Sequence, residues 1–423
     1  MGSAENMKCV AKIVLDENAR ITVLSAMSGT TDALVKTSAL AKNGDKAATE
    51  EVLTMLSDKY TTCVEGLLSG SQSKAKAKIT ATLEVIRKEV AEFSEHMSER
   101  IITSQGELLT SAIFTMYLKE QGVKAVLLNA PDFMVTDKEG KVDTEKLKKE
   151  LTILAADKNT IYITQGFICT NYRGETDNLG RGGSDYSAAL VGAAIDAGEV
   201  QIWTDIDGMH NNDPRFVENT HPIRHMSFDE AAELAYFGAK ILHPAAIAPC
   251  KEHGIPVLLK NTMDSQAQGT RISNEGGDNK SFHAVAAKDG ITAIRICSAR
   301  MLMAYGFLRK VFEIFEKYKT PIDMITTSEV SVSLTIDNDK HLVEIEKELK
   351  ELGNIYIERD NSIVCVVGNM GHGDAGLAAR IFDSVVNIPI KMISYGASMR
   401  SMAMLINTTD KKVTLQSLND NLF

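Results

Sequence analysis

Short apolar runs alternate with longer amphipathic stretches from the start of the chain to about Ser273. The strand-like runs are brief and aliphatic or β-branched: Ile21–Leu24, Ala125–Leu128, Ile161–Thr164, Gln201–Trp203 and Pro256–Leu259. The stretches between them have helical spacing and include Met1–Val14, Glu92–Gln121, Thr144–Ala156 and Ser184–Ala197. This alternation predicts a three-layer α/β/α unit, in which helices cover both faces of a mostly parallel sheet.

The pattern changes after a polar, glycine-containing linker at Ser273–Asn279. Residues 288–359 have the order strand, helix, strand, strand, helix, strand, which is the ferredoxin-like α+β order. Residues 360–423 repeat it one strand short, and a spare apolar strand, Phe282–Ala287, precedes the first copy. We expect a domain over 1–275, a first module over 288–359 and a second module made of 281–287 plus 360–423, whose sheet the spare strand completes.

Composition narrows the class of protein. A chain of 423 residues is long for one hydrophobic core, which suits two or three domains. The net charge of −10 argues against a nucleic-acid partner, and no apolar run approaches the ~20 residues that cross a membrane. Six cysteines are scattered without a C-x-x-C pair or zinc spacing, so we expect reduced thiols and a cytoplasmic location. His221 and His225 have a proline between them and are interpreted as loop residues, so no metal ligand is assigned.

Residues 180–186, Gly-Arg-Gly-Gly-Ser-Asp-Tyr, are the most informative motif. Glycines let a backbone approach a ligand closely, and the first N–H groups of a helix attract anions. Arg181 adds a planar fork that suits a carboxylate or a phosphate. The motif therefore indicates an anion site, although a glycine-rich turn that merely starts a helix is the competing interpretation.

Other polar clusters follow the predicted strands, at residues 25–31, 164–167 and 204–205, where ligands of parallel sheets bind. Glu107 comes from the Ser-Gln-Gly-Glu start of a helical stretch at Ile101–Leu118. The chain has no Walker A sequence, protein-kinase catalytic loop or G-x-G-x-x-G fingerprint. Phosphoryl transfer needs mostly positioning and charge neutralisation, so glycine-rich backbone and cations could suffice.

Several motifs in order resemble the aspartate kinase family. They lie at residues 24–29, 104–107, 180–185, 203–208, 212–215 and 237–244, and residues 322–331 are similar to the effector-binding part of its first regulatory module. The similarity covers essentially the whole chain. It implies the amino-acid-kinase fold followed by two ACT modules, and ATP-dependent phosphorylation of the β-carboxylate of L-aspartate to 4-phospho-L-aspartate, with Mg²⁺. This is the first step of lysine, threonine and methionine biosynthesis.

The resemblance also implies residue roles. Arg181 would grip the α-carboxylate of aspartate and Glu107 its ammonium group, in a pocket lined by Thr31, Phe167 and Ser184. Asp185 would orient the lysine expected at the start of the fold. Thr204, Asp205, His210, Asp213 and Arg215 would face the nucleotide, with Lys240 near its phosphates. The modules would bind an amino-acid effector, most simply lysine, and form a homodimer; the effector residues would be Met301, Gly306, Phe307, Asp323, Ser328 and Glu329.

Each role has a simpler competitor. Asp213 and Arg215 could belong only to a turn, Glu107 could be a first-turn residue facing the helix dipole, and Lys240 could be a surface charge. Phe167 could serve packing alone, and Asp323 and Glu329 could be solvated loop charges. His210 stands where relatives often carry tyrosine, so we expect an altered nucleotide affinity.

The family opens with Lys-Phe-Gly-Gly-Thr-Ser-Val-Gly-Ser, and residues 1–6 match only the tail of that segment. We expect Met1 to be a misplaced start and the chain as written to be a truncated kinase. Three alternatives stay open. A glutamate or acetylglutamate kinase would be separated by substrate competition, and a non-catalytic amino-acid sensor by lysine binding without turnover. The α/β alternation alone would also suit a dinucleotide-binding dehydrogenase, against which the missing glycine fingerprint argues.

Overall fold

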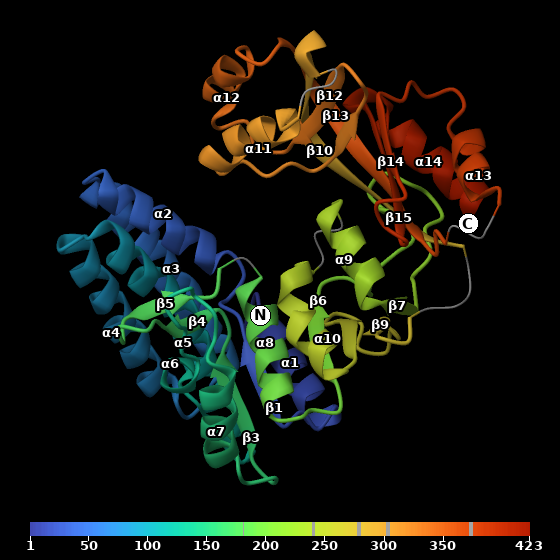
Figure 1. Ribbon diagram of the computed structural model, residues 1–423. Helices are drawn as coiled ribbons and strands as arrows, with labels where there is room; N and C mark the ends of the chain where they lie inside the picture. Colours follow the sequence, from blue (N-terminus) through green and yellow to red (C-terminus); the bar gives the residue numbers. More distant parts are fainter. Residues whose placement is uncertain (181, 239–241, 277–280, 302–304, 372–374) are drawn as a thin grey trace. The chain divides into compact units, whose positions relative to one another are not determined.

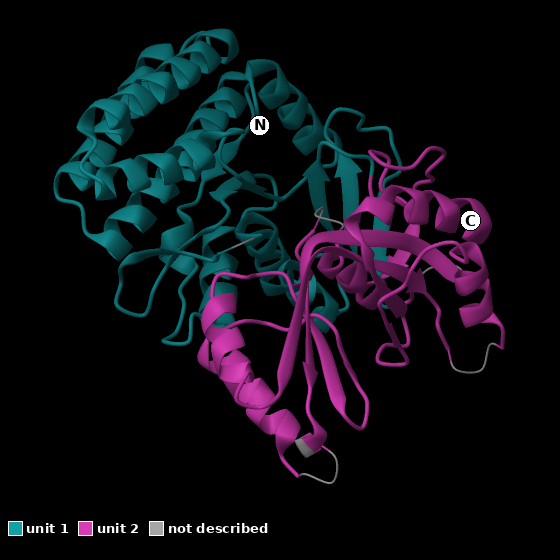
Figure 2. Cartoon of the chain, turned by 90° about the horizontal axis from the view of Figure 1, so that it is seen from above, with its two compact units in different colours: residues 1–207, 245–274 teal, residues 208–244, 275–423 magenta. Residues whose placement is uncertain are grey.

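The computed structural model describes residues 1–180, 182–238, 242–276, 281–301, 305–371 and 375–423. Their contacts divide the chain into two compact units, shown in teal and magenta in Figure 2. The first comprises Met1–Asp207 and Ala245–Asn274, and the second comprises Gly208–Pro244 and Glu275–Phe423. Residues 208–244 therefore belong to the unit that carries the C-terminal modules, although they precede the linker in sequence.

The first unit contains two groups of strands. β1 (Ile21–Leu24), β3 (Ile161–Gln165) and β2 (Ala125–Leu127) pair in parallel in the order β1-β3-β2, with Leu24 opposite Gln165. β6 (Val200–Thr204) pairs in parallel with β8 (Val257–Asn261), which pairs antiparallel with β9 (Thr270–Ser273). α8 (Gly183–Ala194) packs against both β1 and β6 and so links the groups. This is the mostly parallel α/β arrangement predicted from the strand–helix alternation.

Helices surround these strands (Figure 1). They are α1 (Ala4–Asp16), α2 (Thr30–Lys42), α3 (Lys46–Leu67), α4 (Gln72–Ala91), α5 (Glu95–Glu120), α6 (Ala130–Phe133), α7 (Thr144–Leu154) and α10 (Ala248–His253), and a small hairpin is formed by β4 (Ile168–Thr170) and β5 (Thr176–Asn178). Apolar residues three and four apart, including Leu53, Leu56 and Tyr60, bury one face of α3 in an apolar core that α1, α2, α4 and α5 share. α2, α3 and α4 thus form a helical layer with α5, and contacts with α2 and α4 hold α5 in place.

The second unit is built on two long antiparallel strands, β10 (Phe282–Cys297) and β13 (Asn354–Gly368). Residues 282–288 pair with 363–368, and residues 291–297 pair with 354–361, with register shifts between the two halves. The sequence had suggested separate strands for the two modules, but each of these strands runs through both. The strand expected to be spare, at 282–287, pairs beside 363–367 as predicted.

The remaining elements after residue 300 complete two α+β modules on one six-stranded sheet of order β11-β12-β10-β13-β15-β14. They are α11 (Phe307–Lys317), β11 (Ile325–Thr327), β12 (Ser331–Ile336), α12 (Leu342–Leu349), α13 (Leu377–Ser384), β14 (Met392–Tyr395), β15 (Ser401–Asn407) and α14 (Lys411–Leu422). The second unit also contains β7 (His225–Ser227) and α9 (Phe228–Tyr236), which are not part of this sheet. Separate apolar cores lie under the two halves of this sheet. Among the described residues, no helix combines the length and the apolar character that crossing a membrane requires.

Candidate active site

The loop between β1 and α2 is fastened to the middle of α5. The backbone N–H of Met27 donates to Thr110 Oγ1 at 3.0 Å, and the Tyr60 hydroxyl shares hydrogen bonds with Thr110 (3.0 Å) and Thr30 (3.3 Å). α5 can approach this closely because residue 106 is glycine: a Cβ there would lie 2.8 Å from the Cβ of Ala26. The contacts place the residue after Gly106 at the carboxyl end of β1.

That residue is Glu107, whose side chain is buried at 3% exposure. It lies in the middle of α5, which matches the helical stretch predicted at Glu92–Gln121, so the competing interpretation of Glu107 as a first-turn residue is wrong. Burial raises the pKa of the carboxyl to about 7, although the backbone N–H groups of Glu107 and Ala26 oppose the rise. Oε2 has no hydrogen-bond partner among the described residues. A buried carboxylate oxygen without a partner is costly, and a ligand cation would satisfy it.

The end of β3 is held beside this loop. The Gly166 N–H donates to the Leu24 carbonyl at 2.9 Å, and a Cβ at position 166 would lie 2.7 Å from Ser184. Phe167 follows with a left-handed φ of 68°, and its N–H donates to Ser187 Oγ at 3.0 Å. Because Phe167 is not glycine, this backbone conformation carries strain, which is typical of functional sites. Phe167 and Ser184 therefore lie together where β3 meets α8.

Asp185 occupies the first turn of α8, where the helix dipole favours an anion. Burial nevertheless raises the pKa of its carboxyl to about 6. Thr31 lies half-buried in the first turn of α2, while its neighbour Thr30 is fully buried. Arg181 lies outside the described residues.

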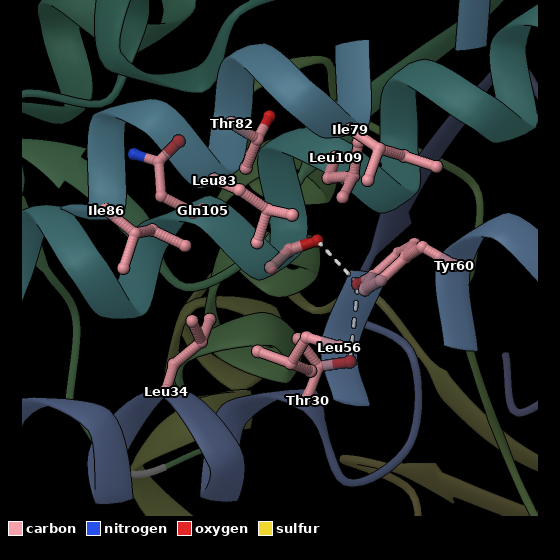
Figure 3. A pocket seen from close by; sticks show the side chains of 11 residues that line it. Thr30, Leu34, Leu56, Tyr60, Ile79, Thr82, Leu83, Ile86, Gln105 and Leu109 are labelled. Atoms are coloured by element: carbon pink, nitrogen blue, oxygen red, sulfur yellow. Dashed lines mark hydrogen bonds between the residues drawn. The ribbon is translucent and has the colours of Figure 1, made fainter. Parts of the chain in front are cut away.

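A small apolar cavity of about 10 Å³ lies behind the loop, between α2, α3, α4 and α5 (Figure 3). Figure 3 shows the Tyr60 hydroxyl at its edge, bonded to Thr30 and to the Gly106 carbonyl. This volume has room for about one water molecule. The cavity is therefore a packing defect of the helical layer rather than a site for an amino acid.

The residues expected to face the nucleotide fall in both units. In the first unit, the Thr204 hydroxyl closes the turn after β6, accepting from the Ile206 N–H at 3.2 Å, and Asp205 is exposed. In the second unit, His210 Nδ1 lies 3.1 Å from Thr220 Oγ1. Lys240 lies outside the described residues.

Asp213 and Arg215 pair with each other. Arg215 Nη2 lies 2.6 Å from Asp213 Oδ2, and the Arg215 N–H also donates to Oδ1 at 2.9 Å. The Arg215 side chain is 74% exposed, whereas the Asp213 side chain is 27% exposed. This geometry is that of a turn closed by an aspartate, and the guanidinium remains at the surface, where a ligand could meet it.

Comparison with known proteins shows the family. Residues 1–261 match the model of the amino acid kinase family, and residues 364–422 match a model of the ACT domain. Lysine-sensitive aspartokinase 3 of Escherichia coli (strain K12) is 34% identical over 428 residues, which cover 98% of this chain and 95% of the relative. The chain belongs to the aspartokinase family.

Further matches agree with this assignment. Chloroplastic aspartokinase 3 of Arabidopsis thaliana is 32% identical over 454 residues, covering 100% of this chain and 80% of the relative. The crystal structure of E. coli aspartokinase III with aspartate and ADP, in the R-state, matches with a TM-score of 0.85 at 33% identity, covering 100% of this chain and 97% of that one. The same enzyme with lysine and aspartate, in the T-state, matches with a TM-score of 0.82 at 34% identity, covering 99% and 96%.

The residues predicted to bind the effector of this aspartokinase lie in the first module. Gly306 caps α11 with a left-handed φ of 81°, Phe307 is buried at the first turn and Met301 ends a short 3-10 turn. Ser328 and Glu329 are exposed in the hairpin between β11 and β12. Asp323 differs from them, because its side chain is only 2% exposed. The interpretation of Asp323 as a solvated loop charge is therefore wrong.

Sequence reasoning missed two side chains that contact Asp323. The Tyr236 hydroxyl donates to Asp323 Oδ1 at 2.9 Å, and Lys288 Nζ donates to the same oxygen at 2.8 Å. Tyr236 directly precedes the family motif at 237–244, which was the one available signal for it. Lys288 follows the apolar run 282–287, and nothing in the sequence distinguishes it from an ordinary charged residue at the end of a strand.

Proposed function

We propose that this aspartokinase catalyses ATP-dependent phosphorylation of the β-carboxylate of L-aspartate to 4-phospho-L-aspartate. The observation that carries the proposal is Glu107, a carboxylate buried at the carboxyl ends of two parallel strands, one oxygen of which has no partner among the described residues. An α-ammonium group would supply the missing charge and hydrogen bonds. The complex of the E. coli relative with aspartate and ADP supports the same ligand pair here.

The substrate is proposed to lie over the ends of β1 and β3. Glu107 would bind its ammonium group, Arg181 its α-carboxylate, and Thr31, Phe167 and Ser184 would line the pocket. The β-carboxylate needs no general base, since its pKa of about 4 leaves it ionised at neutral pH. The task of the protein is therefore to position this anion and to neutralise the charge of the phosphates.

Thr204, Asp205, His210, Asp213 and Arg215 are proposed to meet the nucleotide, with Lys240 near its phosphates, and Asp185 is proposed to orient the lysine expected at the start of the fold. Mg²⁺ is proposed to accompany ATP, since this ion is usually held by phosphates with one or two carboxylates. The exposed carboxylate of Asp205 fits that role. The ion would neutralise charge on the phosphates during transfer.

Regulation is proposed to use the modules at 288–359 and at 281–287 plus 360–423, after a catalytic domain at 1–275. Lysine is the proposed effector, because the E. coli relative is lysine-sensitive and its T-state complex contains lysine. A homodimer formed through the modules and a cytoplasmic location are proposed with it.

An assay for acyl phosphate, with ATP and either aspartate, glutamate or N-acetylglutamate, tests the proposal. We expect product with aspartate and none above background with the other two acids. Turnover of glutamate in preference to aspartate would instead identify a kinase of another carboxylate. Binding of lysine without any turnover at high enzyme concentration would identify a non-catalytic sensor.

A further inference from the structure

Lys288 is the centre of a compact ion cluster in the second unit. Its Nζ lies 2.8 Å from Asp323 Oδ1 and 2.8 Å from Asp337 Oδ2, and 4.8 Å from the centre of the Tyr236 ring. The side chains of Lys288 and Asp323 are 19% and 2% exposed, so this ion pair is largely shielded from water, whereas Asp337 and Tyr236 at its edge are more exposed. One ammonium thus joins two carboxylates of the first module to the last residue of α9.

Asp323 is the most buried member and is incompletely satisfied. Oδ1 accepts from both Tyr236 and Lys288, whereas Oδ2 is buried and has no partner among the described residues. A carboxylate in this position holds one ammonium and retains the capacity for another donor. The geometry is that of a site for alkylammonium groups that a side chain of the protein already occupies.

The chain after Tyr236 packs closely against the backbone of β10 at Ala287 and Lys288. Gly238 has φ of 123°, and a Cβ there would lie 2.1 Å from the Ala287 carbonyl oxygen and 3.4 Å from the Lys288 nitrogen. Residues 236–238 are therefore held to the backbone of β10 independently of the ion cluster. The family motif at 237–244, with the proposed phosphate-binding Lys240, begins at this contact.

Lys288 also marks the change between the two modules. The regular pairing of β10 with β13 is interrupted between Lys288 and Ile291, where the strand passes from the second module to the first. Irregularities of this kind bend a strand locally and re-aim its side chains. A shift of Lys288 would therefore be transmitted to both modules and to the end of α9.

We propose that Lys288 is an internal ammonium ligand of Asp323, and that the regulatory amino acid competes with it, so that effector binding is coupled to α9 through Tyr236. The inference rests on the proposed regulation. It adds the class of ligand, which is a free alkylammonium, and it names Lys288 and Tyr236 as the residues that couple binding to α9. Like charges that share one carboxylate weaken each other's binding. Removal of the Lys288 charge should therefore favour the effector.

The first test measures L-lysine binding by calorimetry to the full chain and to Lys288→Met, which keeps the aliphatic stem and removes the charge. We expect the affinity to rise about 5- to 20-fold, in the range of one coupling free energy. Lys288→Arg keeps the positive charge that competes for Asp323, so it should bind lysine within about 2-fold of the parent. Unchanged or weaker binding in Lys288→Met, with the variant folded, would overturn the inference.

The second test uses Tyr236→Phe, which removes the phenol that links Asp323 to α9. We expect lysine to bind with nearly parental affinity while the lysine concentration that halves kinase activity rises at least ~5-fold, since coupling and not binding is lost. Parallel shifts in binding and inhibition would contradict the coupling role. A parent protein that binds neither lysine nor threonine would refute the proposed regulation itself, an outcome distinct from either variant result.

Discussion

Glu107 in the first unit and Asp323 in the second are two acids with buried side chains, and their surroundings differ. Each has one carboxylate oxygen without a partner among the described residues. No described lysine or arginine pairs with Glu107, and burial raises the pKa of its carboxyl to about 7. Asp323 is paired with Lys288 and bonded to Tyr236.

Glu107 has no cationic partner among the described residues, whereas Asp323 already has the Lys288 ammonium as its partner. Burial of an unpaired carboxylate costs folding free energy, and that cost favours a ligand whose ammonium relieves it. A carboxylate that is already paired binds a ligand ammonium only when the ammonium of the protein side chain leaves. This exchange weakens the affinity for the ligand, but it also displaces the protein side chain whenever the ligand binds. The first arrangement suits a substrate site and the second suits a switch.

The largest expected effect is that of Glu107→Gln on aspartate. The amide keeps the shape but not the charge, so kcat/KM for aspartate should fall about 100- to 1,000-fold, the loss expected for one partner of a buried charge pair. Steady-state kinetics with saturating ATP would measure this. Glu99→Gln, on the exposed face of the same helix, is the matched control and should leave the kinetics near the parent. Equal effects of the two substitutions would remove the proposed ammonium site.

The same variant tests, through the pH dependence of stability, what burial of the Glu107 carboxyl costs. Because the pKa of Glu107 is raised from 4.5 to about 7, folding takes up a proton between these values. The stabilising contribution is therefore complete below pH 4.5 and is lost as pH rises through 7. Relative to Glu107→Gln, the parent should lose on the order of 3 kcal/mol of unfolding free energy between pH 5 and pH 9.

Urea unfolding of both proteins without ligand measures that difference, and subtraction of the variant cancels groups that titrate alike in both. Saturating aspartate should reduce the loss in the parent alone, because the ligand ammonium compensates the charge. Parallel stability curves for parent and variant across this pH range would show that Glu107 ionises normally.

Gly238→Ala addresses the contact that holds the end of α9 to β10. A Cβ would lie 2.1 Å from the Ala287 carbonyl oxygen, so backbone must move, and we expect a loss of about 2 kcal/mol or more in unfolding free energy. Gly290→Ala is the matched control in the same unit. Gly290 also has a positive φ, but its Cβ would meet nothing within 4 Å, so it carries the backbone strain without the clash. Similar losses in both variants would show that conformation, and not the close approach, sets the cost.

The sequence predicted features that depend on residues close together in the chain, and it did not predict contacts between residues far apart in the chain. Local periodicity located β1 at Ile21–Leu24 correctly, and it placed α8 one residue late at its start. It could not show that β10 and β13 each run through two modules, because strand pairing is a non-local property. Glu107 was identified by a motif, but its burial in the middle of α5 depends on packing against distant segments and could not be read from the motif. The partners of Asp323 lie 35 and 87 residues away, where spacing carries no signal.

The smallest effect is expected at Arg215, which extends the comparison to an exposed ion pair. Arg215 is 74% exposed and pairs with Asp213 two residues earlier, so water screens the charges and the turn already holds the partners together. Arg215→Ala should change the unfolding free energy by less than about 1 kcal/mol. Thermal unfolding would measure the change, with Arg173→Ala, another exposed arginine, as the control. The KM for ATP is the informative readout: a several-fold increase with unchanged stability would assign Arg215 to the nucleotide, and an unchanged KM would leave it to the turn alone.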